Sequence, residues 1–131
     1  MLFYSLMREK LVAADQILTR FEQLEKSPGI GANMMSPLAA TLIVPNYKFF
    51  ERIFKLHKKK GIKFTDLNFI DDLNESESLI SFACKTHVRL NGKNKEMESI
   101  YQLLIDENIG VERQLEEEKL RVEKKPILSI K

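Results

Sequence analysis

Apolar residues recur at intervals of three and four positions in several separate segments of this 131-residue chain. In residues 1–26 the spacing is carried by Met7, Leu11, Ala14, Leu18 and Phe21. A helix of 3.6 residues per turn brings such positions onto one face, so each segment predicts an amphipathic helix with one buried side. Proline, glycine or asparagine separates the segments and limits the length of each helix. The chain is therefore predicted to be all-α.

The other helices are predicted from the same spacing together with their boundary residues. They cover residues 36–44, 47–60, 78–86, 95–107 and 111–124. The first of them opens with Ser36-Pro37, which is typical of a helix start, and Gly61 supplies a left-handed helix end after the second. His57 falls on the apolar side of that second helix, and Pro126 is expected to end the last one. Residues 62–77 lose the helical spacing, which indicates an extended loop or a short hairpin.

The composition excludes several classes of protein. The 21 Lys and Arg against 19 Asp and Glu give a net charge of +2, so the overall charge does not argue for a nucleic-acid or membrane partner. A single cysteine, Cys84, excludes an internal disulfide framework and a zinc site made of several thiolates. The longest uncharged run, residues 27–47, is broken by prolines and glycines and does not suit a transmembrane helix. We expect a cytoplasmic protein of a reducing compartment, without a signal peptide.

A pair of helices occurs twice in the middle of the chain. A short apolar helix opens at a serine, as SPLAAT at residues 36–41 and as SLISFAC at 78–84, and a longer amphipathic helix follows each. Both openings resemble the T-P-L-H-x-A opening of an ankyrin repeat. The helices at 49–54 and 100–106 resemble the outer helix of that family. Gly61 also stands where the family has its terminal glycine.

The two units depart from the ankyrin pattern in identifiable places. The interval between Leu38 and Ile80, which would be equivalent, is longer than the roughly 33 residues of a standard repeat. The excess falls in a lengthened outer helix and loop of the first unit, and residues 87–93 resemble an insertion in the second. Ala39 and Ser81 stand in place of the family's histidine.

The resemblance implies a single domain, residues 1–131, that contains a short ankyrin-like stack. Its two repeats would be residues 36–68 and 78–111. A capping helix at 1–26 and a charged helix at 112–125 would cover the two ends, because repeat stacks need their terminal apolar faces protected. The alternative is an irregular helical bundle.

The same resemblance implies a non-catalytic protein–protein interaction module, an adaptor or effector domain whose partner is another protein. Its binding surface would be built from the short inner helices and from loop tips. The expected partner-binding residues at these tips are Lys63, Phe64, Thr65, Phe69, Asp71 and Asp72. Two aromatic side chains on a polar loop exceed what solubility requires, although they could instead fold back to cover the core.

A second function is suggested by the basic residues of segment 48–63. These are Lys48, Arg52, Lys55, Lys58, Lys59, Lys60 and Lys63, with Glu51 as the only acidic residue. Such a density of positive charge suits nucleic acid or an anionic membrane, which is the alternative function. The simpler interpretation is a solvated helix face, because the last lysines complement the helix dipole and an acidic run follows at 66–77. Nucleic acid is therefore not the expected partner.

No catalytic, metal or cofactor site is expected. Cys84 and His87 are three residues apart and could contact each other as nucleophile and base, but a buried core cysteine is the simpler interpretation. No ligand pair has a recognised metal-binding spacing. The segment Gly29-Ile30-Gly31-Ala32 lacks the strand, the third glycine and the Lys-Ser/Thr ending of a phosphate-binding loop, so a plain loop is predicted.

Overall fold

The computed structural model describes residues 2–26, 37–64, 67–70, 76–91, 93–107 and 109–129. Within these ranges it contains seven helices: α1 (Leu2–Met7), α2 (Leu11–Gln23), α3 (Pro37–Ile43), α4 (Tyr47–Lys59), α5 (Leu79–Arg89), α6 (Lys95–Asp106) and α7 (Val111–Ser129). A short antiparallel hairpin, β1 (Asn68–Ile70) and β2 (Ser76–Ser78), pairs Phe69 with Glu77 between α4 and α5. The predicted all-α class is confirmed, and the hairpin lies where the helical spacing was lost.

The N-terminal segment forms two helices, so the prediction of one continuous helix over residues 1–26 is wrong. The break falls at the exposed run Arg8-Glu9-Lys10. Glu9 has a φ of 55°, in the left-handed region that ends a right-handed helix, and the Lys10 amide donates to the Ser5 carbonyl at 2.8 Å. The break lets α1 contact both α2 and α3. The apolar spacing runs through it because both helices bury their apolar sides in one core.

Polar side chains fix the starts of the three central helices. Asn46 accepts a hydrogen bond from the Phe49 amide at 3.2 Å at the start of α4. Ser78 does the same for α5, and Asn94 does so for α6. These caps satisfy amides that have no partner inside the helix. Ser36, the predicted cap of α3, lies outside the described residues.

Two helix ends differ from their predictions. Helix α5 continues to Arg89, whereas the spacing predicted an end at Thr86 and an inserted polar segment from 87 to 93. The half-buried His87 and Val88 give this extra turn an apolar side. Helix α7 runs to Ser129 and does not end before Pro126.

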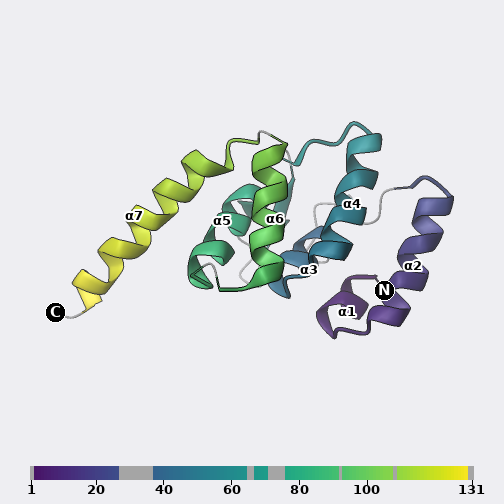
Figure 1. Ribbon diagram of the computed structural model, residues 1–131, viewed down its shortest axis with the longest axis horizontal. Helices are drawn as coiled ribbons and strands as arrows, with labels where there is room; N and C mark the ends of the chain where they lie inside the picture. The colour runs from purple at the N-terminus through teal and green to yellow at the C-terminus, as the bar shows by residue number, and fades with distance from the viewer. Residues whose placement is uncertain are drawn as a thin grey trace.

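The helix pairs α1–α2, α3–α4 and α5–α6 follow one another along the longest axis of the molecule, with α1 and α2 at one end and α7 at the other (Figure 1). Helix α3 contacts α1, α4 and α5, and α5 contacts α6 and α7. All residues from Pro37 to Leu42 of α3 are buried. Helix α3 is therefore the centre of the core.

Helices α4 and α6 contact each other and run parallel. At their N-terminal ends, Glu96 Oε2 accepts a hydrogen bond from the Tyr47 amide at 2.8 Å. At their C-terminal ends, Lys58 Nζ lies 2.8 Å from Glu107 Oε2. The two contacts hold the helices in register at both ends.

The burial of Leu18 tests whether α2 is part of the core. Leu18 is fully buried, so we expect Leu18→Ala to lower the free energy of unfolding by about 2–5 kcal/mol. Val12 is the matched control, since it lies on the same helix with 76% of its surface exposed. Val12→Ala should change the free energy by less than about 0.5 kcal/mol. Urea unfolding followed by circular dichroism measures both, and equal effects would contradict the packing of α2.

Candidate interaction surface

The structure separates the predicted partner-binding residues. Three of them lie outside the described residues: Thr65, Asp71 and Asp72. Only the backbone of Phe69 is described, in β1. Lys63 is exposed, whereas Phe64 is 4% exposed. The expectation that Phe64 is an exposed loop aromatic is therefore wrong, and the binding role of the other residues stays a prediction.

Phe64 is buried because the chain reverses just before it. Gly61 has a φ of 74°, and the Ile62 amide donates to the His57 carbonyl at 3.0 Å. This turn brings the Phe64 ring to 6.0 Å from both the Phe50 and the Phe54 rings, measured between centroids. Burying a phenylalanine contributes about 1.5–3 kcal/mol, which favours covering the core over exposing the ring.

A pocket of about 380 Å³ opens beside Phe64. It lies where the end of α4, the loop from Gly61 and two residues after α6, Glu107 and Ile109, come together. Its apolar wall is formed by Leu38, Phe54, Ile62, Phe64, Leu67 and Ile109. The polar lining residues are His57, Lys58, Lys63 and Glu107. The mixture of apolar walls and a few charged groups is typical of a ligand-binding cleft.

His57 lies in the last turn of α4 and is only 3% exposed. Its Nδ1 atom is buried without a hydrogen-bond partner in the described structure. Burial lowers the pKa of His57 to about 4, because the charged form is disfavoured away from water. The imidazole is therefore neutral at neutral pH and adds no positive charge to the pocket. Its place on the apolar side of the helix was the sequence signal for this burial.

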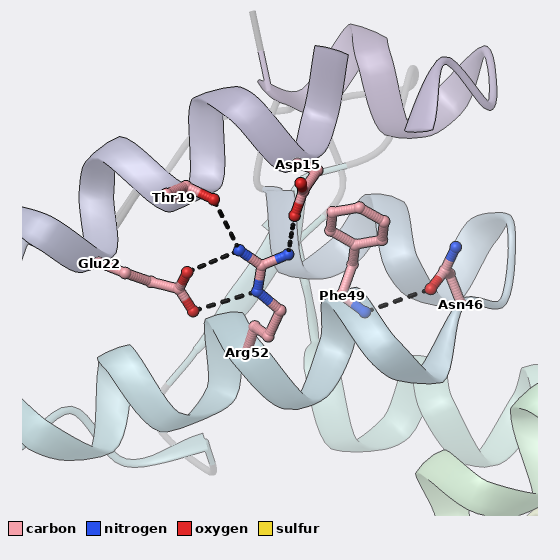
Figure 2. A network of polar contacts seen from close by, with 6 residues as sticks. All are labelled: Asp15, Thr19, Glu22, Asn46, Phe49 and Arg52. Atoms are coloured by element: carbon pink, nitrogen blue, oxygen red, sulfur yellow. Dashed lines mark hydrogen bonds and ion pairs between the residues drawn. The ribbon is translucent and has the colours of Figure 1, made fainter. Parts of the chain in front are cut away.

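The positive charge of Arg52 on α4 is paired with acidic side chains of α2 (Figure 2). Its Nη1 lies 2.6 Å from Asp15 Oδ1, and its Nη2 lies 2.6 Å from Glu22 Oε1. Nε also donates to Glu22 at 3.1 Å, and Nη2 donates to Thr19 at 3.2 Å. These hydrogen bonds raise the pKa of Arg52 further. Its charge joins α2 to α4 and is not free for a partner.

The other basic residues of this segment fall into two groups. Lys58 is paired with Glu107, and Lys55 lies 3.8 Å from Glu51. Four lysines are exposed and form no ion pair with any residue that the structure describes: Lys48, Lys59, Lys60 and Lys63. Lys59, Lys60 and Lys63 follow one another closely at the end of α4; Lys63 lines the pocket, whereas Lys59 lies in a second hollow with Glu22 and Arg52.

Cys84 and His87 each have a packing role on α5. Cys84 is fully buried, and its thiol lies 3.7 Å from the Val111 carbonyl oxygen. Burial raises the pKa of Cys84 to about 12, which opposes formation of a nucleophilic thiolate. His87 Nε2 lies 2.7 Å from Glu98 Oε1, and its ring stacks on Tyr101 at 4.2 Å. These contacts favour the interpretation of Cys84 as a core residue.

The structure bears on three other kinds of site that the sequence raises: a metal site, a membrane span and a phosphate-binding loop. Among the described residues no three His, Cys, Asp or Glu side chains are grouped so that they could hold a metal ion. Over the same residues, every helix is too short or too polar to cross a bilayer. The glycine pair of residues 29–32 lies outside the described residues.

The chain matches no protein-family model, no curated protein and no solved structure. Inference about its function therefore rests on the residues and contacts described above.

The Arg52 contacts predict a measurable loss of stability. We expect Arg52→Ala to lower the free energy of unfolding by about 1–3 kcal/mol, because it leaves Glu22 and Asp15 without their charge-assisted hydrogen bonds. Lys55→Ala is the control on the same helix face, since its pairing is long and exposed, and it should cost less than about 0.5 kcal/mol. Urea unfolding measures both variants. An Arg52→Ala variant as stable as the control would refute the role of Arg52 in holding α2.

The buried His57 predicts a dependence of stability on pH. Its pKa is about 4 in the folded protein and 6.5 ordinarily, so only the unfolded chain takes up this proton as the pH falls below 6.5. The contribution of neutral His57 is present above pH 6.5 and is lost toward pH 4, by about 3 kcal/mol. His57→Gln should remove this part of the acid sensitivity. Urea unfolding at several pH values between about 7 and 4 measures it, and identical pH profiles for the two proteins would contradict the burial of His57.

Proposed function

We propose that this chain is a non-catalytic protein–protein interaction module built as a short ankyrin-like stack. The observation that supports it is the stacking of two helix pairs, α3–α4 and α5–α6, with the hairpin between them. The first helices of the pairs, α3 and α5, contact each other, and so do the second helices, α4 and α6. Repeat stacks have this arrangement, since each unit contacts its neighbours through equivalent elements.

The N-terminal helices α1 and α2 contact the first pair in the same way as the two pairs contact each other. Helix α1 contacts α3, and α2 is joined to α4 through Arg52. The α1–α2 pair therefore takes the position of a further unit rather than that of a single capping helix. Three stacked pairs reach the number that such architectures generally need for stability.

The surface best suited to a partner lies at the C-terminal end of α4, around Lys63. It combines the pocket with the loop that follows α4, and loops on a rigid scaffold commonly carry binding residues. An apolar centre surrounded by an exposed polar rim is typical of a protein interface. The described residues include no comparable convergence of nucleophile, base and oxyanion donor.

The alternative, binding to nucleic acid or an anionic membrane, is less well supported. Arg52 and Lys58 are held by acidic partners, which leaves the basic segment without a continuous row of free charge. Such binding depends mainly on several cations that contact phosphates together. The exposed Lys48, Lys59 and Lys60 keep the alternative testable.

The two functions are distinguished by selecting ligands on the full chain. Peptides taken from a random displayed library at about 0.15 M salt should bind, and a random-sequence DNA duplex and phosphatidylserine vesicles should not. Fluorescence polarisation measures peptides and DNA, and co-sedimentation measures vesicles. The variant Lys59→Glu/Lys60→Glu, with Lys93→Glu/Lys95→Glu as control, reports on the basic surface. Duplex or vesicle binding that falls steeply with salt and is lost only in the first variant, with no selected peptide, would overturn the proposal.

A further inference from the structure

The pocket beside Phe64 has the size and walls of a site for one large side chain. Its volume of about 380 Å³ is large enough to hold one large side chain, and six of its lining residues are apolar. The neutral His57 in its wall adds no charge that an apolar group would have to desolvate. In protein interfaces, such pockets receive one buried anchor residue that contributes much of the binding energy.

The rim of the pocket carries unbalanced positive charge within the described structure. Lys58 and Lys63 line it, and the exposed Lys60 directly precedes Gly61, which also lines it. Glu107 is the acidic residue among the lining side chains, and its carboxylate lies 2.8 Å from Lys58 Nζ. Lys60 and Lys63 are exposed and lack an ion pair with any described residue, whereas Lys59 lies on another side of α4, in a hollow with Glu22 and Arg52. A partner with acidic residues on either side of its anchor would match this charge.

We propose that this pocket binds an acidic peptide segment of a partner protein by taking in one apolar side chain, an inference that rests on the proposed function. The apolar wall supplies affinity by burying the anchor, and the lysines select acidic flanks. Both features are needed, because lysines alone bind any polyanion and an apolar pocket alone accepts any exposed apolar residue.

A peptide titration tests the two features separately. The probe is the acidic hexapeptide Glu-Asp-Glu-Phe-Asp-Glu, added to the ¹⁵N-labelled full chain and followed by NMR shifts of the backbone amides. We expect saturable shifts at Ile62, Lys63 and Ile109, with a Kd of about 1 mM or tighter. Replacing the phenylalanine of the peptide with serine should weaken binding at least about tenfold, because the anchor is lost. Replacing the acidic flanks with lysines should abolish it.

Two protein variants locate the site. Lys63→Glu should weaken binding of the hexapeptide at least about fivefold. Lys48→Glu, at the exposed start of α4, should change the affinity less than about twofold. Ile109→Trp fills the pocket from its half-buried wall and should abolish binding. Circular dichroism and the urea midpoint show whether each variant is folded. If Ile109→Trp does not fold, the affinities of Lys63→Glu and of the serine peptide still test whether the peptide binds in the pocket.

The outcomes separate this inference from the proposed function. No shifts with the hexapeptide, equal affinity for the serine peptide, or equal affinity of Lys63→Glu would overturn the pocket assignment. If peptides selected from the random library bind and shift amides elsewhere, the interaction module stands and the pocket assignment fails. If that library yields no peptide, the proposed function itself fails.

Discussion

Helix α3 has no exposed face, and the arrangement of the rest of the structure depends on this. All its residues from Pro37 to Leu42 are buried, so it needs neighbours on every side. Helices α1, α4 and α5 supply them, and α5 in turn is covered by α6 and α7. A helix that is apolar all round is stable only inside a larger assembly of helices. The helix pairs follow one another in chain order because α1 and α5 both contact α3, and α6 contacts α4 (Figure 1).

The second helices of the pairs are positioned by polar contacts at their ends and flanks. Arg52 holds α2 against α4, while Glu96 and Lys58 hold the two ends of α4 against α6. Exposed ion pairs contribute little stability individually, whereas hydrogen bonds with fixed geometry set the register between helices. The same contacts pair Arg52 and Lys58 of the basic segment with acidic side chains. Of the lysines that remain free, Lys63 lines the pocket and Lys60 directly precedes its lining residue Gly61.

Burial of Phe64 shapes the candidate site. The ring packs against Phe50 and Phe54, and Phe64 and Lys63 both line the pocket. In the segment after Gly61, Phe64 therefore packs into the core while its neighbour Lys63 is exposed to solvent. The site thus combines apolar walls with the exposed Lys60 and Lys63, and this supports an acidic, singly anchored peptide as ligand.

The sequence by itself determined the all-α class, the hairpin region and most helix starts, because these depend on neighbours within one or two turns. Asn46, Ser78 and Asn94 cap the helices that they precede, and the apolar spacing marks the buried sides. Tertiary structure alone decided that the first helix breaks at Glu9, that Phe64 turns inward and that Arg52 is paired. The six proposed site residues were chosen because they fall on expected loop tips. This reasoning agrees with the exposure of Lys63, but it missed the burial of Phe64 and the pocket. Burial and ion pairing join residues far apart in the chain, as Arg52 and Glu22 are, and no local pattern encodes which distant side chain will be there.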